Sequence, residues 1–338
     1  MKHIIFILII VIASSCSDKK KSDLLILDKS VSLKCIEYDN ELIMPNPLSI
    51  ELIDNSLYLF QPQGEDAALI VDKNNGKIKG TWGKRGNGPG EFTYPLFWGE
   101  NPKEKQIYLY DMNRFILRSY TYHHLSNKSD LVIKNEVKLK PNTVALRYAT
   151  VLDNGNIIAS CIYNQESPLL LMNNNLDSIN SFGDIPDKDH KSIDLRSYWG
   201  TLSSFQNKFV FAMAELGYIV CYEQNKNEII KKWEHYLEKP IYKGNALNEK
   251  LLKRGFSNVK MTNNYIFCVY SGKKWDSPNM DVHPETILVF NHQGKLLKNF
   301  HLDRRIGKIV VSSDEKTIYA ISLEPEISII RYEIENYL

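Results

Sequence analysis

Short apolar runs, each preceded at once by a polar turn, recur along the whole chain. Two clear copies are Asp54-Asn55-Ser56 before Leu57–Phe60 and Asp153–Asn156 before Ile157–Ser160. Six such runs begin at residues 57, 107, 157, 209, 265 and 318, so the steps between them are 50, 50, 52, 56 and 53 residues. A spacing this constant predicts an internal repeat in which each copy is one supersecondary unit.

Each copy contains further strand-like segments around its central run. One apolar segment precedes the turn, as at Leu48–Ile53, and another follows the run, as at Leu69–Val71 and Ile287–Phe290. Turns that end in glycine, such as Asn74-Asn75-Gly76, then lead into a fourth strand, because glycine adopts positive φ without a steric cost. Six units of four antiparallel strands, without a convincing long helix, predict an all-β fold: a six-bladed β-propeller.

The two ends of the repeat array predict how the ring closes. The sixth copy reaches its third strand at Ile327–Ile330, and little sequence follows for a fourth. Val31–Tyr38 is a spare alternating segment at the other end. We expect this N-terminal strand to complete the last blade, so that the propeller spans residues 30–338. The alternatives are two stacked β domains or a solenoid, although a solenoid needs polar capping ends and none is visible.

The N-terminal segment is typical of an export signal. Ile4–Ala13 is an unbroken apolar run after a short basic head, too short to span a bilayer as a helix but suited to a signal peptide over residues 1–15. The run ends in Ala13-Ser14-Ser15-Cys16. Small residues directly before a cysteine resemble a bacterial lipobox, which implies cleavage and lipidation at Cys16. The alternative is an ordinary secretory cleavage site with a chance cysteine.

The polar stretch after Cys16 bears on where in the cell the protein is anchored. Residues 16–29 contain no apolar residue until Leu24 and indicate a flexible tether. Two or more acyl chains would hold the protein firmly at a membrane. Under the sorting rule of enteric lipoproteins, the absence of aspartate after the cysteine (Ser17 here) favours the outer membrane of the bacterial cell envelope. Whether the protein faces the periplasm or the cell exterior stays open.

Composition and charge narrow the class of partner. Forty-two Lys and Arg residues against 40 Asp and Glu leave a formal charge of +2, which gives no support for nucleic-acid binding. Beyond Cys16 the chain has Cys35, Cys161, Cys221 and Cys268, with no C-x-x-C spacing for zinc or redox chemistry. Each lies in an apolar stretch, so buried free thiols are favoured over disulfides.

The most distinctive stretch is the glycine-rich segment Gly83–Pro95, followed further on by Asp111-Met112-Asn113-Arg114. Together they resemble the NHL-type repeat, and with the lipobox the chain is similar to TolB-like six-bladed propeller lipoproteins. The resemblance implies the fold and the location in the cell envelope, but the family has no agreed biochemical activity. It also marks a structural set in the second blade: Gly86, Gly88, Pro89, Gly90, Phe92, Asp111, Asn113 and Arg114.

Those residues have mechanical uses. We expect the three glycines to adopt positive φ, Pro89 to fix its own φ, and Phe92 to fill the gap between blades. The two side chains Asp111 and Asn113 should hydrogen-bond the backbone of their own turn. We expect Arg114 to pack across neighbouring blades.

Ligand-binding candidates follow from the geometry of a propeller. The loops between blades and those joining second to third strands lie on one face of the ring, called here the loop-rich face. Aromatic residues beside cations in such loops recognise sugars, peptides or anions. The candidates are Lys84, Arg85, Trp98, Arg147, Tyr148, Tyr198, Trp199, Trp275 and His283. The alternative is that Trp98, Trp199 and Trp275 only pack between blades. Pro240–Gly255 is a further long loop, in which we expect a short helix.

Signatures of enzymes are weak. The chain lacks G-x-S-x-G, H-E-x-x-H and a dinucleotide fingerprint, and its eight histidines are scattered. We therefore expect no catalytic residue, cofactor or metal, with Glu51 the clearest channel-side carboxylate. The favoured hypothesis is a lipid-anchored envelope module that binds a protein, peptide or glycan on its loop-rich face. The alternative is a propeller-type hydrolase, lactonase or lyase with a site in the channel.

Overall fold

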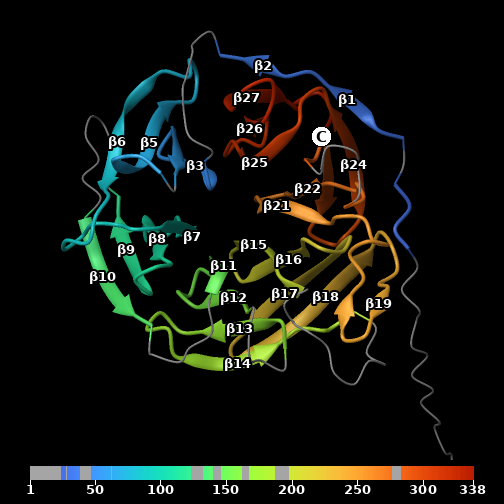
Figure 1. Cartoon of the computed structure of the whole chain (residues 1–338), viewed down its shortest axis with the longest axis horizontal. Helices are drawn as coiled ribbons and strands as arrows, with labels where there is room; N and C mark the ends of the chain where they lie inside the picture. The colour runs from blue at the N-terminus through green and yellow to red at the C-terminus, as the bar shows by residue number, and fades with distance from the viewer. Residues whose placement is uncertain are drawn as a thin grey trace, which may run out of the picture.

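The strands form six sheets arranged as blades around a central axis (Figure 1). The computed structural model describes residues 24–27, 29–38, 47–61, 63–122, 132–139, 146–161, 167–186, 198–275 and 283–338. Cys16 and the predicted signal peptide lie outside these residues. The predicted six-bladed propeller is confirmed, and no α-helix occurs in the described part of the chain.

The first three blades follow one another in simple meander order. Blade 1 consists of β3 (Ser49–Ile53), β4 (Ser56–Phe60), β5 (Asp66–Asp72) and β6 (Ile78–Lys84). Blade 2 consists of β7 (Pro95–Asn101), β8 (Gln106–Asp111), β9 (Ile116–Thr121) and β10 (Val132–Lys138). Blade 3 consists of β11 (Leu146–Val151), β12 (Ile157–Cys161), β13 (Leu169–Met172) and β14 (Ser178–Phe182).

The other three blades repeat this order, with additions at the edges. Blade 4 consists of β15 (Gly200–Phe205), β16 (Lys208–Met213), β17 (Tyr218–Asn225) and β18 (Glu228–Tyr236). Blade 5 contains β21 (Phe256–Met261), β22 (Tyr265–Tyr270), β23 (Thr286–Asn291) and β24 (Leu296–Leu302), and blade 6 contains β25 (Ile306–Val311), β26 (Thr317–Ser322) and β27 (Ser328–Glu333). The six apolar runs of the sequence repeat coincide with the second strand of each blade.

The hydrophobic core lies between neighbouring blades. Both faces of a second strand are covered, so every residue of β4 and β8 is buried. Phe60 and Trp82 of blade 1, for example, pack in one cluster with Ile107 and Tyr120 of blade 2. Stacking in a ring therefore buries both faces of each sheet, which a single blade could not do.

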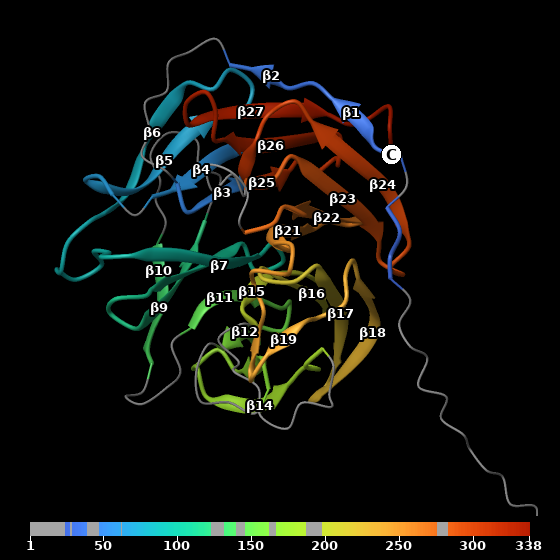
Figure 2. The same ribbon diagram turned by 45° about the vertical axis from the view of Figure 1, so that its right-hand side comes forward.

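The N-terminal chain closes the ring, as predicted, but as two short strands. β1 (Val31–Leu33) adds to the outer edge of blade 5 in parallel with β24, and β2 (Ile36–Glu37) pairs antiparallel with β27 as the fourth strand of blade 6 (Figure 2). The break falls where the segment crosses between blades. There the Cys35 amide donates to the carboxylate of Asp303 at 3.0 Å, which holds the crossing in place.

The aromatic residue of the glycine-rich segment fills the gap between blades 1 and 2, as predicted. Phe92 has no exposed surface. Its ring lies 5.6 Å from that of Trp82 and 6.2 Å from that of Tyr120. The guanidinium of Arg118 lies over it at 5.0 Å, and this buried arginine was not predicted.

The aspartate of the motif is a buried hydrogen-bond hub. Asp111 is fully buried and accepts from the Thr93 amide and hydroxyl, each at 2.7 Å, and from the amides of Tyr94 and Arg114. It therefore bonds its own turn, as predicted, and also fastens the inter-blade loop. The Arg114 guanidinium donates to two carbonyl groups of that loop. Asn113 is exposed, and among the described residues its side chain makes no hydrogen bond, so that part of the prediction was wrong.

Two of the three loop glycines need positive φ. Gly86 has φ of 153° and Gly90 of 75°, but Gly88 is not in this region, which corrects the prediction for Gly88. Gly88 lies close to the Glu91 carboxylate: its amide donates to that group at 2.8 Å, and a Cβ would lie 2.9 Å from it, so a larger residue would displace the end of the Glu91 side chain. Pro89 is exposed at the turn.

The long loop before blade 5 forms a hairpin rather than the predicted helix. β19 (Tyr242–Lys243) pairs with β20 (Ala246–Leu247). Gly244 has φ of 63°, a left-handed conformation that favours a tight turn over a helix. Within the described residues, no helix is long and apolar enough to cross a membrane.

Three of the four cysteines predicted as free thiols have described side chains, and all three are free. Cys221 and Cys268 are buried and Cys35 is partly buried. Burial raises the pKa of Cys35 to about 11 and that of Cys221 to about 12. These thiols are therefore protonated and unreactive at neutral pH.

Candidate functional site

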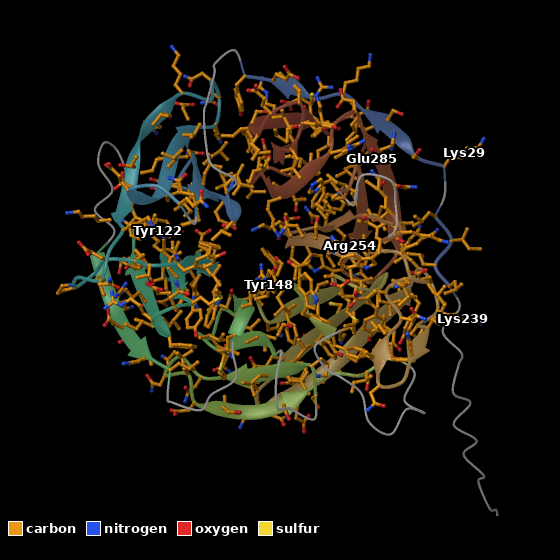
Figure 3. The ribbon with its side chains drawn as sticks, viewed as in Figure 1. Lys29, Tyr122, Tyr148, Lys239, Arg254 and Glu285 are labelled. Carbon is orange, nitrogen blue, oxygen red and sulfur yellow. The ribbon has the colours of Figure 1, made fainter. Side chains whose placement is uncertain are left out.

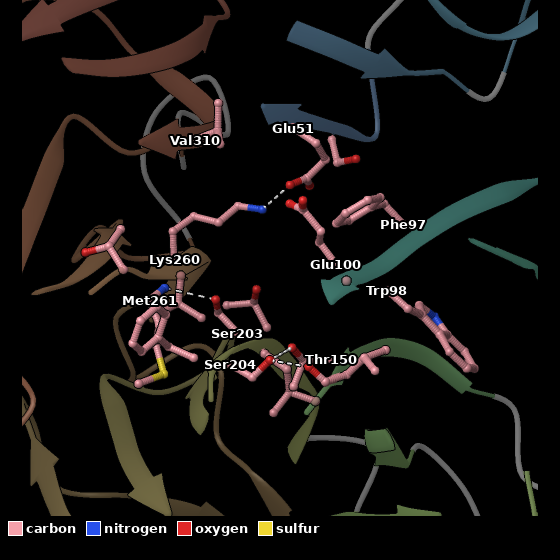
Figure 4. A pocket seen from close by; sticks show the side chains of 18 of the residues that line it. Glu51, Phe97, Trp98, Glu100, Thr150, Ser203, Ser204, Lys260, Met261 and Val310 are labelled. Atoms are coloured by element: carbon pink, nitrogen blue, oxygen red, sulfur yellow. Dashed lines mark hydrogen bonds and ion pairs between the residues drawn. The ribbon is translucent and has the colours of Figure 1, made fainter. Parts of the chain in front are cut away.

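The innermost strands of all six blades enclose a central cavity of about 550 Å³. The strands are β3, β7, β11, β15, β21 and β25, and the middle residues of each line the space (Figures 1 and 4). Both the starts and the ends of these strands contribute, so the cavity runs along the axis of the ring. A cavity of this size accommodates a small organic molecule.

Charged side chains from different blades meet inside the cavity. Lys260 of β21 donates to the carboxylate of Glu51 of β3 at 2.6 Å (Figure 4). Glu100 of β7 points into the same space and accepts a hydrogen bond from the Tyr122 hydroxyl. Burial raises the pKa of both glutamates, and Lys260 opposes the rise. The sequence singled out Glu51 alone, so Glu100 is a second channel carboxylate that it missed.

Lys308 of β25 is a cation that bonds a backbone carbonyl rather than a carboxylate. Its ammonium donates to the Ser257 carbonyl at 2.7 Å. The pKa of Lys308 is lowered to about 8, chiefly by burial and also by the nearby cations Lys260 and Arg147, while Glu51 opposes them. At neutral pH the ammonium is therefore still charged, but it is held in a site that disfavours the charge.

Neutral polar groups fill part of the remaining wall. The Thr150 and Ser204 hydroxyls lie 2.7 Å apart, and Ser204 also donates to the Val151 carbonyl at 2.7 Å. The Ser203 hydroxyl accepts from the Met261 amide at 2.9 Å (Figure 4). These hydroxyls join the inner strands of blades 3, 4 and 5 and give the cavity a polar lining.

Three of the predicted residues lie together at the end of the cavity on the loop-rich face: Arg147 and Tyr148 line the cavity, and Trp199 packs against Tyr148. We call Arg147, Tyr148 and Trp199 the mouth cluster. The Tyr148 and Trp199 rings stack with centroids 5.7 Å apart, and the Arg147 guanidinium lies 5.3 Å from the first centroid and 5.9 Å from the second. Tyr148 lies beside the central opening (Figure 3). Arg147 is exposed and both rings are partly exposed, so this cluster can contact a ligand.

A second group of polar side chains lies farther around the same face. The Arg254 guanidinium lies 3.3 Å from the centre of the Trp275 ring. Burial raises the pKa of Glu215 to about 7; Glu249 adds to the rise and Arg254 opposes it. One oxygen of the Glu215 carboxylate, the Arg254 Nε and the Trp275 Nε1 are buried without a hydrogen-bond partner among the described residues. Trp275 is thus part of a packed polar cluster rather than an open surface.

The other predicted ligand residues lie apart from the mouth cluster. Trp98 is 2% exposed and stacks on Tyr110 with centroids 4.2 Å apart, so it packs between blades 2 and 3. Tyr198 has no exposed surface and its hydroxyl meets that of Tyr242. These two side chains therefore belong to the core, which is the alternative that the sequence left open for Trp98.

The last three predicted ligand residues, Lys84, Arg85 and His283, lie away from the mouth cluster. Arg85 donates to the carbonyl groups of Gln61 and Thr93, so it fastens the inter-blade loop. Lys84 is exposed at the end of β6, and His283 is exposed before β23. The structure brings none of these three to the mouth cluster.

The residues that the sequence missed share one feature: they point inward from inner strands. Each of the residues Glu100, Lys260 and Lys308 is the one charged residue of its inner strand. A charge on an innermost strand could have been noted from the repeat, but only closure of the ring brings residues about 200 positions apart, such as Glu51 and Lys260, into contact. Among the described residues, no group of three or more His, Cys, Asp or Glu side chains is placed to hold a metal ion.

Comparison with known proteins agrees with this architecture. The sequence model of a family described as "TolB-like 6-blade propeller-like" matches residues 27–314. No curated protein matches the sequence. A solved protein from Bacteroides fragilis, described as exported, is 14% identical with a TM-score of 0.58, and the alignment covers 90% of this chain and 99% of that one.

Two other solved propellers are more distant. The WD40 repeats of RRP9 are 10% identical with a TM-score of 0.49, over 86% of this chain and 95% of that one. BamB from Moraxella catarrhalis is 11% identical with a TM-score of 0.42, over 88% of this chain and 73% of that one. At these levels the comparisons concern the fold alone.

Proposed function

The chain belongs to the TolB-like six-bladed propeller family, and on that premise we propose that it is a binding module of the bacterial cell envelope. Its ligand is a protein, peptide or glycan that contacts the loop-rich face. The observation that carries the proposal is the mouth cluster: a guanidinium over two stacked aromatic rings at the opening of the central cavity. Aromatic side chains and arginine are the residues that dominate binding energies at such sites.

We further propose that Cys16 is lipidated and that residues 16–29 tether the propeller to the outer membrane. Support comes from the apolar run that ends directly before Cys16 and from the description of the Bacteroides fragilis propeller as exported. Membrane fractionation tests this part. The Cys16→Ser variant should leave the membrane fraction, because no acyl chain can be attached. Retention of the variant in the membrane fraction would refute the anchor.

Capture of the ligand tests the binding proposal. The change is Arg147→Ala together with Trp199→Ala, which removes the guanidinium and the larger ring. After cross-linking in cells, the amount of co-purified ligand should fall at least about tenfold, since each such residue contributes 1 kcal/mol or more. The variant should remain folded, because Arg147 is exposed, and its melting temperature should fall by a few degrees, because Trp199 is only partly exposed and stacks on Tyr148.

The matched control for this capture is Ile78→Ala, which removes a 53% exposed apolar side chain from the outer strand of blade 1. This variant should capture as much ligand as the unchanged protein. Equal capture by the double variant would exclude the mouth cluster as the binding site. Equal loss in the control would show that the effect is not specific to the mouth.

A second candidate function, a hydrolase, lactonase or lyase, is favoured by one observation. Glu51 and Glu100 lie in the cavity with raised pKa values beside Lys260, and paired carboxylates can serve general acid and base catalysis. Metal analysis of the purified protein separates the candidates. Stoichiometric calcium in the channel would favour the enzyme over the binding module.

A further inference from the structure

Two cations at the end of the cavity nearest the loop-rich face have no carboxylate partner among the described residues. The Arg147 guanidinium and the Lys308 ammonium form no ion pair there, whereas Lys260 is paired with Glu51. Both unpaired cations lie near one ring: Arg147 at 5.3 Å and Lys308 at 6.0 Å from the centre of Tyr148. Burial disfavours the charged form of Lys308 most, and repulsion from Lys260 and Arg147 adds to this effect.

The balance of charge along the cavity favours a ligand with one negative charge. Lys103, Arg147, Lys260 and Lys308 line it together with Glu51, Glu100 and Asp153. This leaves an excess of one positive charge, located at the two unpaired cations. A dianion would be repelled by the two buried glutamates, whereas a monoanion restores neutrality.

We propose that the cavity binds a small hydroxylated carboxylic acid, whose carboxylate lies between Arg147 and Lys308. The planar guanidinium pairs with a carboxylate through two parallel hydrogen bonds, and the ammonium adds a point charge. The Thr201 and Ser203 hydroxyls and the Asn258 amide line the same space and match hydroxyl groups of the ligand. This inference goes beyond the proposed function, because it concerns a small molecule and does not depend on capture of an envelope partner.

Calorimetric titration with sodium glucuronate tests the inference, with glucose as the neutral probe of the same size and sodium chloride to match ionic strength. Glucuronate should bind and glucose should bind at least about tenfold more weakly. Lys308→Met keeps an unbranched side chain that is one atom shorter and removes the charge, so it should weaken glucuronate binding at least about tenfold. Lys77→Met, at an exposed position outside the cavity, should leave binding unchanged.

The pH dependence gives a readout that needs no variant. Binding requires charged Lys308, and in the free protein burial, with Lys260 and Arg147 and against Glu51, lowers its pKa to about 8. Glucuronate stays ionised above pH 7, so its affinity should be constant near pH 7 and fall by up to tenfold per unit between pH 8 and 10. Lys308→Met should lack this slope.

Several outcomes would overturn the inference. They are no binding of glucuronate, equal binding of glucose, a flat pH profile in the unchanged protein, or full binding by Lys308→Met. The Lys308 variant should still capture the envelope ligand, since Arg147 and Trp199 remain. A protein that binds glucuronate but captures no partner would therefore refute the proposed function alone.

Discussion

Removal of residues 24–38 should lower the melting temperature of the propeller by about 10 °C or more. This segment joins four blades: the Leu25 amide donates to Tyr236 of blade 4 at 2.7 Å, β1 pairs with blade 5, β2 with blade 6, and the Tyr38 hydroxyl donates to the Lys73 carbonyl of blade 1. Leu33 is 3% exposed within the cluster between blades 5 and 6.

The magnitude follows from what the deletion exposes. Burial of one leucine contributes about 2 kcal/mol, and each lost hydrogen bond about 1 kcal/mol, so the total is about 5 kcal/mol or more. One kcal/mol corresponds to about 2 °C in a domain of this size, the lower end of the usual range, because the entropy of unfolding grows with chain length. Calorimetry should compare the deletion variant, which begins at residue 39, with a protein that begins at residue 24. A difference below about 2 °C would show that the N-terminal segment does not close the ring.

Phe92→Ala should destabilise the protein by about 3–5 kcal/mol, the usual cost of deleting a buried phenylalanine ring. The ring is fully buried between Trp82 and Tyr120, so its removal leaves a cavity in the interface between blades 1 and 2. The substitution also removes the surface on which the Arg118 guanidinium lies. Denaturant unfolding gives the free energy directly.

Phe115→Ala is the matched control for this substitution. Phe115 belongs to the same blade and is 44% exposed, so its loss should change the free energy of unfolding by no more than about 0.5 kcal/mol. If the two variants unfold at the same denaturant concentration, Phe92 does not seal the interface between blades 1 and 2.

The repeat made the architecture predictable from the sequence. A second strand is covered on both faces, so it is apolar at nearly every position, and six such strands at a step of about fifty residues define the blades. Ring closure was predictable because the last copy lacks a fourth strand. The division of the closing segment into β1 and β2 was not, since it depends on the contact between Cys35 and Asp303, which are distant in sequence.

The candidate site was predictable only in part. Arg147, Tyr148 and Trp199 could be placed on one face because their loops occupy equivalent positions in consecutive blades. Trp98 could not be distinguished from them. An indole in the first strand of a blade can face either the central opening or the next blade, and its direction depends on its rotamer and, here, on stacking with Tyr110. The pairing of Glu51 with Lys260 likewise requires the closed ring.

A ligand that acts as proposed must contact the mouth of the cavity. Site-specific photo-cross-linking in cells tests this most directly, with the reactive side chain placed at Trp199 or, on the opposite face, at Asn227 in the exposed turn between β17 and β18. We expect a defined covalent adduct from position 199 and none from position 227, if the ligand binds at the mouth. An adduct from position 227 alone, or from neither position while the ligand still co-purifies, would contradict binding at the mouth.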